Sequence, residues 1–233
     1  MLKTNKTLKE LSLSNNNITD VESIGEGLKT NKTLTYLHLN SNNITDVQSI
    51  GEGLETNNTL TRLFLENNNI TDVQSIGGAL KTNSTLWRLD LSNNNITDDS
   101  GIQSIIDGLK TNNTLTILRL TNNNITDVQS IGEGLKTNNT LTTLYLSSNN
   151  ITDDGGIQSI IGVLKTNNTL KELYIWINQL SDNMKSQLRR IQQYKQDGSN
   201  GYQQVEGMYI YRHKLIVYIL YIYLFVYYQL KYP

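Results

Sequence analysis

Hydrophobic residues recur along the chain in a pattern that is repeated seven times. The clearest copy, residues 86–98, reads LWRLDLSNNNITD, with leucine or isoleucine at its first, fourth, sixth and eleventh positions and asparagine at its ninth. Successive copies are 26 or 29 residues apart, and they begin at Leu8, Leu34, Leu60, Leu86, Leu115, Leu141 and Leu170. A fixed spacing in this range predicts a solenoid, in which each unit buries its apolar residues against its neighbours.

Each unit is predicted to contain a strand followed by a helix. Residues 9–13 alternate between polar and apolar positions, which predicts a strand whose leucines point inward. Val21, Ile24 and Leu28 then recur at the spacing of one helical face. The units of 29 residues have three additional residues at the start of this helix, and we expect them to lengthen it by most of a turn.

Polar residues and glycines mark the first turns of the predicted helix. Thr19 and Glu22 have the spacing of a capping box. Gly25 and Gly27 weaken the helix, and we expect them to allow close approach to the sheet or to the next helix. One aspartate precedes each helix, and we interpret these residues as favourable charges at helix N-termini rather than as calcium ligands. They are Asp20, Asp46, Asp72, Asp98, Asp127 and Asp153.

One asparagine follows each predicted strand at an offset that never varies. A stacked amide side chain can satisfy backbone groups in a buried turn that would otherwise lack partners. We therefore expect these residues to form a structural ladder. They are Asn16, Asn42, Asn68, Asn94, Asn123, Asn149 and Asn178.

The pattern L-x-x-L-x-L-x-x-N-x-L/I resembles the leucine-rich repeat. The helical second half and the unit length resemble the ribonuclease-inhibitor-like subclass, which is also found in NOD-like receptors and in the Ran GTPase-activating protein. The resemblance covers residues 2 to about 191. It implies an α/β leucine-rich-repeat solenoid (a horseshoe), with a parallel sheet on the concave face and helices on the convex face. It also implies protein binding, with no cofactor, rather than catalysis.

The composition changes after the repeats and divides the chain into four parts. Residues 1–180 hold the seven repeats, and the chain begins inside a repeat with no visible cap. This beginning fits a fragment, a frayed first repeat or a repeat covered by a partner. Residues 181–196 are predicted to form a C-terminal capping helix, with Ser181 and Asp182 at its start. Residues 197–204 are expected to be a linker, and residues 205–233 a hydrophobic, tyrosine-rich tail.

The tail contains an uninterrupted apolar and tyrosine segment at residues 215–228, LIVYILYIYLFVYY. As a helix, this segment would span about 21 Å, which is short of a hydrocarbon core of about 30 Å. Tyrosine also prefers the membrane interface to the bilayer centre. Three interpretations stay open: a membrane-associated tail, a tail of low significance or mistranslated sequence, and an extended segment that packs on the solenoid.

Charge and composition exclude several classes of site. The formal net charge is −1 and the chain has no cysteine, so disulfides and thiolate metal sites are excluded. The start of the chain lacks a secretory signal. We therefore expect a cytoplasmic protein, in which the many Asn-x-Thr triplets are turn asparagines rather than glycosylation sites. No metal site is predicted.

The residues that differ between repeats point to a binding surface. Every aromatic residue before Leu180 occupies an outward strand position on the expected concave face, as do the arginines and the histidine of that region. Exposed aromatic residues and arginine dominate the energetics of protein interfaces. The candidate partner-binding residues are Tyr36, His38, Arg62, Phe64, Trp87, Arg88, Asp90, Arg119, Tyr145, Tyr174 and Trp176.

Other functional classes fit the sequence less well. The concave positions carry five basic and four acidic residues, whereas a nucleic-acid groove requires a basic excess. No catalytic triad is predicted, because Asp90 lies two strands away from His38. The chain is therefore expected not to be an enzyme, and its oligomeric state stays open.

Two alternative functions remain. One is a regulator of a Ran-type GTPase, which the missing acidic C-terminal tract disfavours, and the other is a scaffold tethered to a membrane by its tail.

Overall fold

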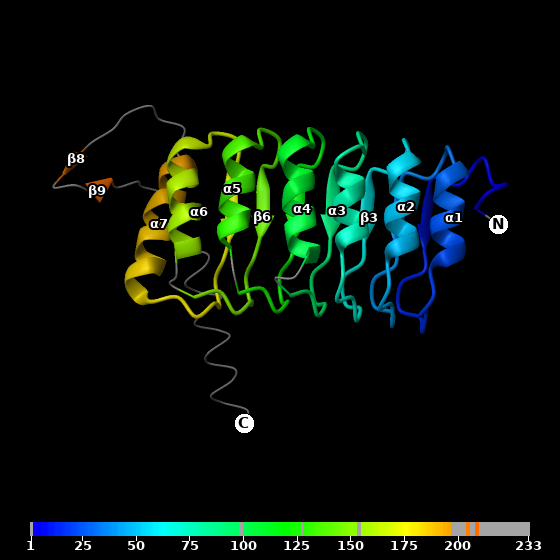
Figure 1. The fold of residues 1–233 in the computed structure, drawn as a ribbon, viewed down its shortest axis with the longest axis horizontal. Helices are drawn as coiled ribbons and strands as arrows, with labels where there is room; N and C mark the ends of the chain where they lie inside the picture. The colour runs from blue at the N-terminus through cyan, green and yellow to red at the C-terminus, as the bar shows by residue number, and fades with distance from the viewer. Residues whose placement is uncertain are drawn as a thin grey trace, which may run out of the picture.

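The computed structural model describes residues 2–97, 100–126, 128–152, 155–196, 204–205 and 208–209. Strands and helices alternate along the repeats (Figure 1). The strands are β1 (Glu10–Ser12), β2 (Tyr36–His38), β3 (Arg62–Phe64), β4 (Arg88–Asp90), β5 (Ile117–Arg119), β6 (Thr143–Tyr145) and β7 (Glu172–Tyr174). The helices are α1 (Glu22–Thr30), α2 (Gln48–Thr56), α3 (Gln74–Leu80), α4 (Ser100–Thr111), α5 (Gln129–Thr137), α6 (Gly155–Thr166) and α7 (Asp182–Gln196).

The seven strands form one parallel sheet in chain order, as the repeat pattern predicts. Equivalent residues of adjacent repeats are paired, for example Leu37 with Leu63. The strands are three residues long, shorter than the expected segment 9–13. Backbone hydrogen bonds nevertheless extend over that segment, because Lys9 O accepts from Tyr36 N (3.0 Å) and Leu13 N donates to His38 O (2.9 Å).

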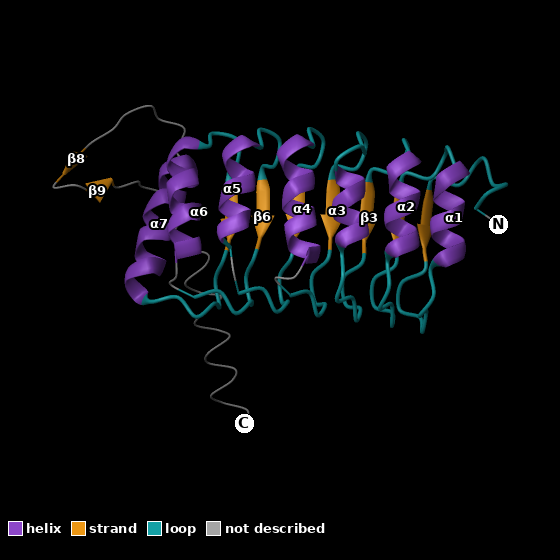
Figure 2. Cartoon of the chain, in the orientation of Figure 1, coloured by secondary structure: helices purple, strands orange, loops and turns teal. Residues whose placement is uncertain are grey.

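The sheet forms one layer and the helices form the other (Figure 2). The apolar positions of the repeat pattern lie between the layers, and Leu63, Leu65 and Ile70 of the third repeat are fully buried. The first repeat differs, since Leu8 and Leu11 are only half-buried against the core. The core is therefore continuous along the stack and thins at the first repeat.

The predicted capping box is wrong. Helix α1 begins at Glu22 after Val21, and no side chain of Val21 caps it. Instead Asp20 Oδ1 accepts a hydrogen bond from Glu22 N at 2.7 Å, and Asp46 and Asp72 make the equivalent bond to the first residues of α2 and α3. Thr19 lies one position too far from the helix, so the short carboxylate of the aspartate takes this role. Asp98, Asp127 and Asp153 lie outside the described residues.

The helices of the longer units and the helical glycines behave as expected. Helices α4 and α6 have 12 residues, whereas α1 has 9, so the insertion lengthens the helix. A Cβ atom added at Gly51 would lie 2.5 Å from the backbone carbon of Ser75 in the adjacent helix. The close approach is thus to the next helix rather than to the sheet.

The expected asparagine ladder is present. Asn68, which is buried, donates from Nδ2 to Leu39 O of the preceding repeat and to Leu65 O of its own, both at 3.0 Å. Its Oδ1 accepts from Ile44 N at 3.0 Å. From Asn42 onward, each such side chain therefore joins two repeats through backbone groups that would otherwise lack partners. Asn16 of the first repeat is exposed, and it donates to Leu13 O (3.0 Å) and Ser14 O (3.1 Å) of its own repeat.

The structure ends, in its described part, with α7 and two short strands. Met184 and Leu188 of α7 are buried, and Ser181 Oγ accepts from Met184 N at 3.1 Å at the start of the helix. Strands β8 (Gln204–Val205) and β9 (Met208–Tyr209) pair in antiparallel fashion, so β8 includes the last residue of the expected linker 197–204. Residues 215–228 lie outside the described residues. Among the helices that are described, none combines the length and the apolar character needed to cross a bilayer.

Candidate functional site

The candidate residues lie on the sheet surface opposite the helices, which we call the sheet face. All eleven occupy β2 to β7 or positions within two residues of these strands. Ten of them are half-buried and none belongs to the apolar core. The exception is Asp90, whose side chain is only 7% exposed. The structure therefore gathers these residues on one surface and joins most of them by ring stacking or charge contacts.

Arg62 lies between two aromatic rings on the neighbouring strands. Its guanidinium carbon is 4.6 Å from the ring centroid of Tyr36 on one side and 4.4 Å from that of Trp87 on the other. Both distances are within the range of a cation–π interaction. Because the three residues come from consecutive repeats, this stack runs across the strands and holds the Arg62 side chain in place.

A second stack runs beside the first one, through the middle positions of the strands. The rings of His38 and Phe64 are stacked, with centroids 4.5 Å apart and planes 8° from parallel. The guanidinium of Arg88 lies over the Phe64 ring at 4.9 Å. His38 Nε2 also lies 3.1 Å from Glu10 Oε1, so β1 contributes a carboxylate to the end of this stack.

Asp90 is enclosed by two arginines. Its Oδ2 lies 3.8 Å from Arg88 Nη2 and 3.6 Å from Arg119 Nε. We expected Asp90 to contact a partner, but its carboxylate is buried. It is flanked by a basic side chain of its own strand and one of the next strand, and its Oδ1 accepts a hydrogen bond from Ser92 N at 3.2 Å.

The second stack continues into the last two repeats. The guanidinium of Arg119 lies 4.2 Å from the ring centroid of Tyr145, and Arg119 Nη2 donates to the Tyr145 hydroxyl at 3.4 Å. The rings of Tyr145 and Tyr174 are stacked, with centroids 4.3 Å apart and planes 3° from parallel. Tyr174 donates its hydroxyl hydrogen to Glu172 at 3.2 Å.

Trp176 lies apart from these stacks, at the end of the repeats. Its backbone N–H donates to Ser147 Oγ at 3.2 Å. The guanidinium of Arg189, on α7, lies 5.4 Å from the Trp176 ring. Arg189 is not among the candidate residues that the sequence indicates. Nothing in the repeat pattern signals this contact, because α7 is not a repeat.

Glu66 introduces an unsatisfied acidic group at the edge of the sheet face. Its Oε2 is buried and has no hydrogen-bond partner within the described part of the chain. Burial raises the pKa of this carboxyl and is the largest effect. A hydrogen bond from its own backbone N–H lowers the pKa, the nearby charge of Asp90 raises it, and Arg88 and Arg119 lower it. The Nε atoms of Arg62, Arg88 and Arg119 are likewise buried without a hydrogen-bond acceptor among the described residues.

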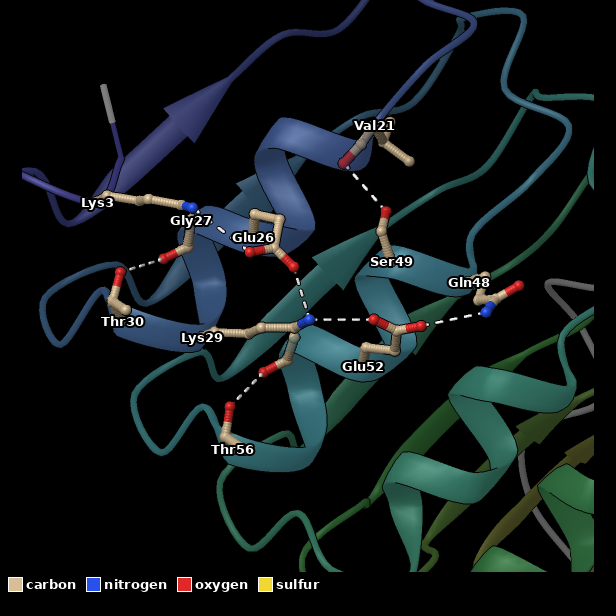
Figure 3. Close-up of polar contacts among 11 residues, drawn as sticks. Lys3, Val21, Glu26, Gly27, Lys29, Thr30, Gln48, Ser49, Glu52 and Thr56 are labelled. Atoms are coloured by element: carbon tan, nitrogen blue, oxygen red, sulfur yellow. Dashed lines mark hydrogen bonds and ion pairs between the residues drawn. The ribbon is translucent and has the colours of Figure 1, made fainter.

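The outer surface of the helices, which we call the helix face, has a different chemistry. Lys29 Nζ lies 2.6 Å from Glu26 and 3.0 Å from Glu52 on the next helix (Figure 3). The hydrogen bond from Lys29 lowers the pKa of both carboxyls. These groups are well exposed to solvent, and such ion pairs contribute little to stability. The helix face of the repeats carries no aromatic residue.

A second asparagine ladder was missed by the sequence analysis. Asn57, which is 3% exposed, donates to Leu28 O (2.8 Å) and Asn31 O (3.0 Å) and accepts from Leu60 N (2.7 Å). Five further asparagines make the equivalent bonds to the preceding repeat, and they are Asn31, Asn83, Asn112, Asn138 and Asn167. Their constant position, three residues before the first leucine of each repeat, is the signal that could have identified them.

The described side chains hold no cluster of histidine, aspartate or glutamate that could bind a metal ion. The chemistry of the sheet face is instead that of a contact surface. Stacked rings on adjacent strands turn their faces toward one another, so the solvent meets ring edges and guanidinium N–H groups. Ring edges carry partial positive charge, so this surface is rich in groups that attract hydrogen-bond acceptors.

The sequence matches two models of one repeat family. One is described as leucine rich repeats (2 copies) and matches residues 6–55. The other is described as leucine rich repeat and matches residues 56–73, 82–103, 111–128 and 137–157. Together the matches cover more than half of the chain, and they coincide with the repeating strand–helix units. A comparison with the curated proteins found no match.

Among solved structures, the fold is similar to that of an internalin (InlF) from Listeria monocytogenes, with a TM-score of 0.57 and 24% sequence identity. The match covers 84% of this chain and 48% of that one, so this chain spans about half the length of the internalin structure. At this identity the likeness shows the fold alone. On the family matches and the seven parallel strand–helix units, the chain belongs to the leucine-rich repeat family.

Proposed function

We propose that the chain is a protein-interaction module that binds a protein partner through its sheet face. Leucine-rich repeat proteins generally mediate protein–protein interactions. The observation that carries the proposal is that the aromatic and arginine side chains of the repeats gather on one face, while the helix face carries polar and charged residues. Tyrosine, tryptophan and arginine are the residues enriched in binding hot spots.

The stacks also support the proposal because they order the surface before a partner arrives. Immobilising a flexible side chain at an interface costs about 0.5–1.5 kcal/mol of binding free energy. Arg62 is already held between Tyr36 and Trp87, and Phe64 is already held between His38 and Arg88. A partner that contacts these residues therefore meets a surface with little remaining conformational freedom.

Alanine substitution of sheet-face rings tests the proposal. The immobilised full-length chain should capture a partner from an extract of its native cells, and substitution of Phe64, Trp87 and Tyr145 by alanine should abolish the capture. Circular dichroism establishes that the variant is folded. The matched control replaces Lys29 and Glu52 of the helix face by alanine and should leave capture intact. Loss of capture in the control alone would contradict the proposal.

The subclass and the location of the protein belong to the same proposal. The helices of 7 to 12 residues in the repeats support a ribonuclease-inhibitor-like unit, and helix content measured by far-ultraviolet circular dichroism checks it. We also propose that the protein is cytoplasmic. Mass spectrometry of the native protein tests this location, because N-linked glycans on exposed asparagines such as Asn43 and Asn69 would contradict it.

The two alternative functions stay predictions. No contact among the described residues favours regulation of a Ran-type GTPase, and a GTP-hydrolysis assay with and without the protein distinguishes that activity from simple binding. The segment 215–228 of the membrane-tether interpretation lies outside the described residues. Cell fractionation of the full chain and of a chain ending at Asn200 tests it, because a tether predicts that only the full chain enters the membrane fraction.

A further inference from the structure

Three arginines lie close together at the centre of the sheet face, on the consecutive strands β3, β4 and β5. Arg62 and Arg88 are paired in register, and Arg119 lies two residues further along the next strand, in register with Asp90. Neighbouring strands are separated by roughly 4.8 Å, and like charges directly opposite one another are destabilising. A cluster of this kind calls for anions to balance it.

The anions supplied by the described residues fall short of that balance. Arg88 and Arg119 share the carboxylate of Asp90, at 3.8 and 3.6 Å, which is longer than a charged hydrogen bond. Arg62 has no carboxylate within ion-pair distance among the residues that the structure describes. The other acidic group nearby is Glu66, whose buried Oε2 has no hydrogen-bond partner among the described residues.

The aromatic residues hold the arginines so that a ligand must approach their edges. Arg62 is covered on both sides by Tyr36 and Trp87, and Arg119 lies over Tyr145. Their terminal N–H groups are the parts left for a ligand. A guanidinium edge matches the two oxygens of a carboxylate, and fixing the guanidinium reduces the entropy lost on binding.

We infer that the centre of the sheet face binds an acidic segment of the protein partner, whose carboxylates contact the guanidinium edges of Arg62 and Arg88. This inference rests on the proposed function, because it names the chemistry of the partner at the same surface. Arg119 contributes at the margin of the site, and Asp90 positions Arg88 and Arg119 without contacting the partner. The ring edges on either side supply partial positive charge that complements the same carboxylates.

The surface fits an acidic polypeptide better than a single-stranded nucleic acid. Proteins bind single strands by stacking bases on the faces of aromatic rings. Both faces of Phe64 are covered, by His38 and Arg88, and both faces of Tyr145 are covered, by Arg119 and Tyr174. A base therefore finds no free face at these rings, whereas a carboxylate requires only the guanidinium edges.

A binding titration with a defined probe tests the inference. The probe is a fluorescein-labelled peptide with four consecutive glutamates between glycines, and its neutral counterpart has four glutamines. Fluorescence anisotropy with the full chain at low salt should show binding of the glutamate peptide alone. The double variant Arg62→Gln/Arg88→Gln should weaken this binding at least about tenfold, a loss of about 1.4 kcal/mol. Equal binding of both peptides would overturn the inference.

Matched variants separate a specific site from general charge attraction. Arg189→Gln removes an arginine that also lies over a tryptophan but belongs to α7, and it should leave the affinity unchanged. Arg62→Lys retains the charge but loses the planar fork, so it should weaken binding by an intermediate factor. An effect of Arg189→Gln as large as that of Arg62→Gln would show that net charge alone attracts the peptide, which overturns the inference.

Selection from a displayed library of random twelve-residue peptides distinguishes failure of the inference from failure of the proposed function. Enrichment of acidic peptides that require Arg62 and Arg88 supports both. Enrichment of non-acidic peptides that lose binding when Phe64, Trp87 and Tyr145 are alanine overturns the inference and retains the proposed function. Peptides that bind independently of the sheet face contradict both. Arginine-dependent binding of oligothymidylate without any peptide binding also overturns the inference.

Discussion

One residue of each repeat adopts a left-handed backbone conformation shortly after its strand. In six repeats this residue is asparagine or serine, with φ between 53° and 57°. In the last repeat it is Ile177, with φ of 57° and a side chain that is 74% exposed. Asparagine tolerates this region well, whereas a β-branched residue is strained there. The exposed isoleucine therefore costs stability and gains no burial.

Ile177→Asn should stabilise the last repeat. Relief of the left-handed strain is worth about 1 kcal/mol, which corresponds to a rise in the melting temperature of about 2–4 °C for a chain of this size. Thermal unfolding followed by circular dichroism measures the change. The control Ile177→Val remains β-branched and should leave the melting temperature unchanged. A variant with asparagine that melts at or below the wild-type temperature would contradict this explanation.

Glu66 should make stability depend on pH. Its pKa is raised in the folded chain, mainly by burial, so the folded state binds this proton more tightly than the unfolded state does. Protonation of Glu66 therefore adds to the free energy of unfolding. This stabilisation is complete below the pKa of Glu66 in the unfolded chain and is lost as pH rises through its pKa in the folded chain. Glutamine stays neutral at every pH, so Glu66→Gln avoids the cost of burying the carboxylate charge. The variant should therefore unfold at a higher urea concentration than wild type at pH 7. The difference should vanish near about pH 3, where Glu66 is protonated in both states. A difference that is constant with pH would exclude this role.

At the scale of the strand–helix unit, the sequence predicts most of the structure, because every repeat must bury the same apolar positions and pair the same backbone groups with its neighbours. Leu63 pairs with the equivalent leucines of both neighbouring repeats, and Asn68 bonds backbone groups of the preceding repeat, so the spacing of these residues specifies the stacking. The start of the helix was not predictable to the residue, because Thr19 and Asp20 are both good capping residues and only the backbone path decides between them. The second ladder, of which Asn57 is a member, was overlooked because asparagine is also common in turns.

Two glycines on adjacent helices should respond oppositely to alanine. At Gly51, a Cβ atom would lie 2.5 Å from the backbone of Ser75, so Gly51→Ala must push two helices apart and should cost about 1–3 kcal/mol. At Gly78 no atom lies within 4 Å of the added Cβ, so Gly78→Ala should gain about 0.5–1 kcal/mol from helix propensity. Urea unfolding of both variants measures the difference. If both substitutions changed the free energy of unfolding in the same direction, close approach of the helices would not explain why residue 51 is glycine.

At the scale of the whole molecule, the sequence predicts which face carries the candidate residues but not how they contact one another. The L-x-x-L-x-L pattern, whose x positions all face outward, is enough to place Arg62 and Trp87 on the same side of the sheet. The insertion of Arg62 between Trp87 and Tyr36 depends on side-chain conformations and on pairing between residues about 26 positions apart. The burial of Asp90 has the same origin, because it results from arginines on two strands. The sequence therefore predicts separate contact residues, whereas the structure shows connected stacks.

The most direct test of the binding surface is site-specific photocrosslinking in the native cell. A photoreactive phenylalanine derivative is placed at Trp87 or Tyr145 on the sheet face and, in separate chains, at Glu52 or Lys136 on the helix face. If the sheet face binds the partner, the two sheet-face positions form adducts with the same polypeptide and the helix-face positions do not. Adducts formed from the helix face, with none from the sheet face, would contradict it.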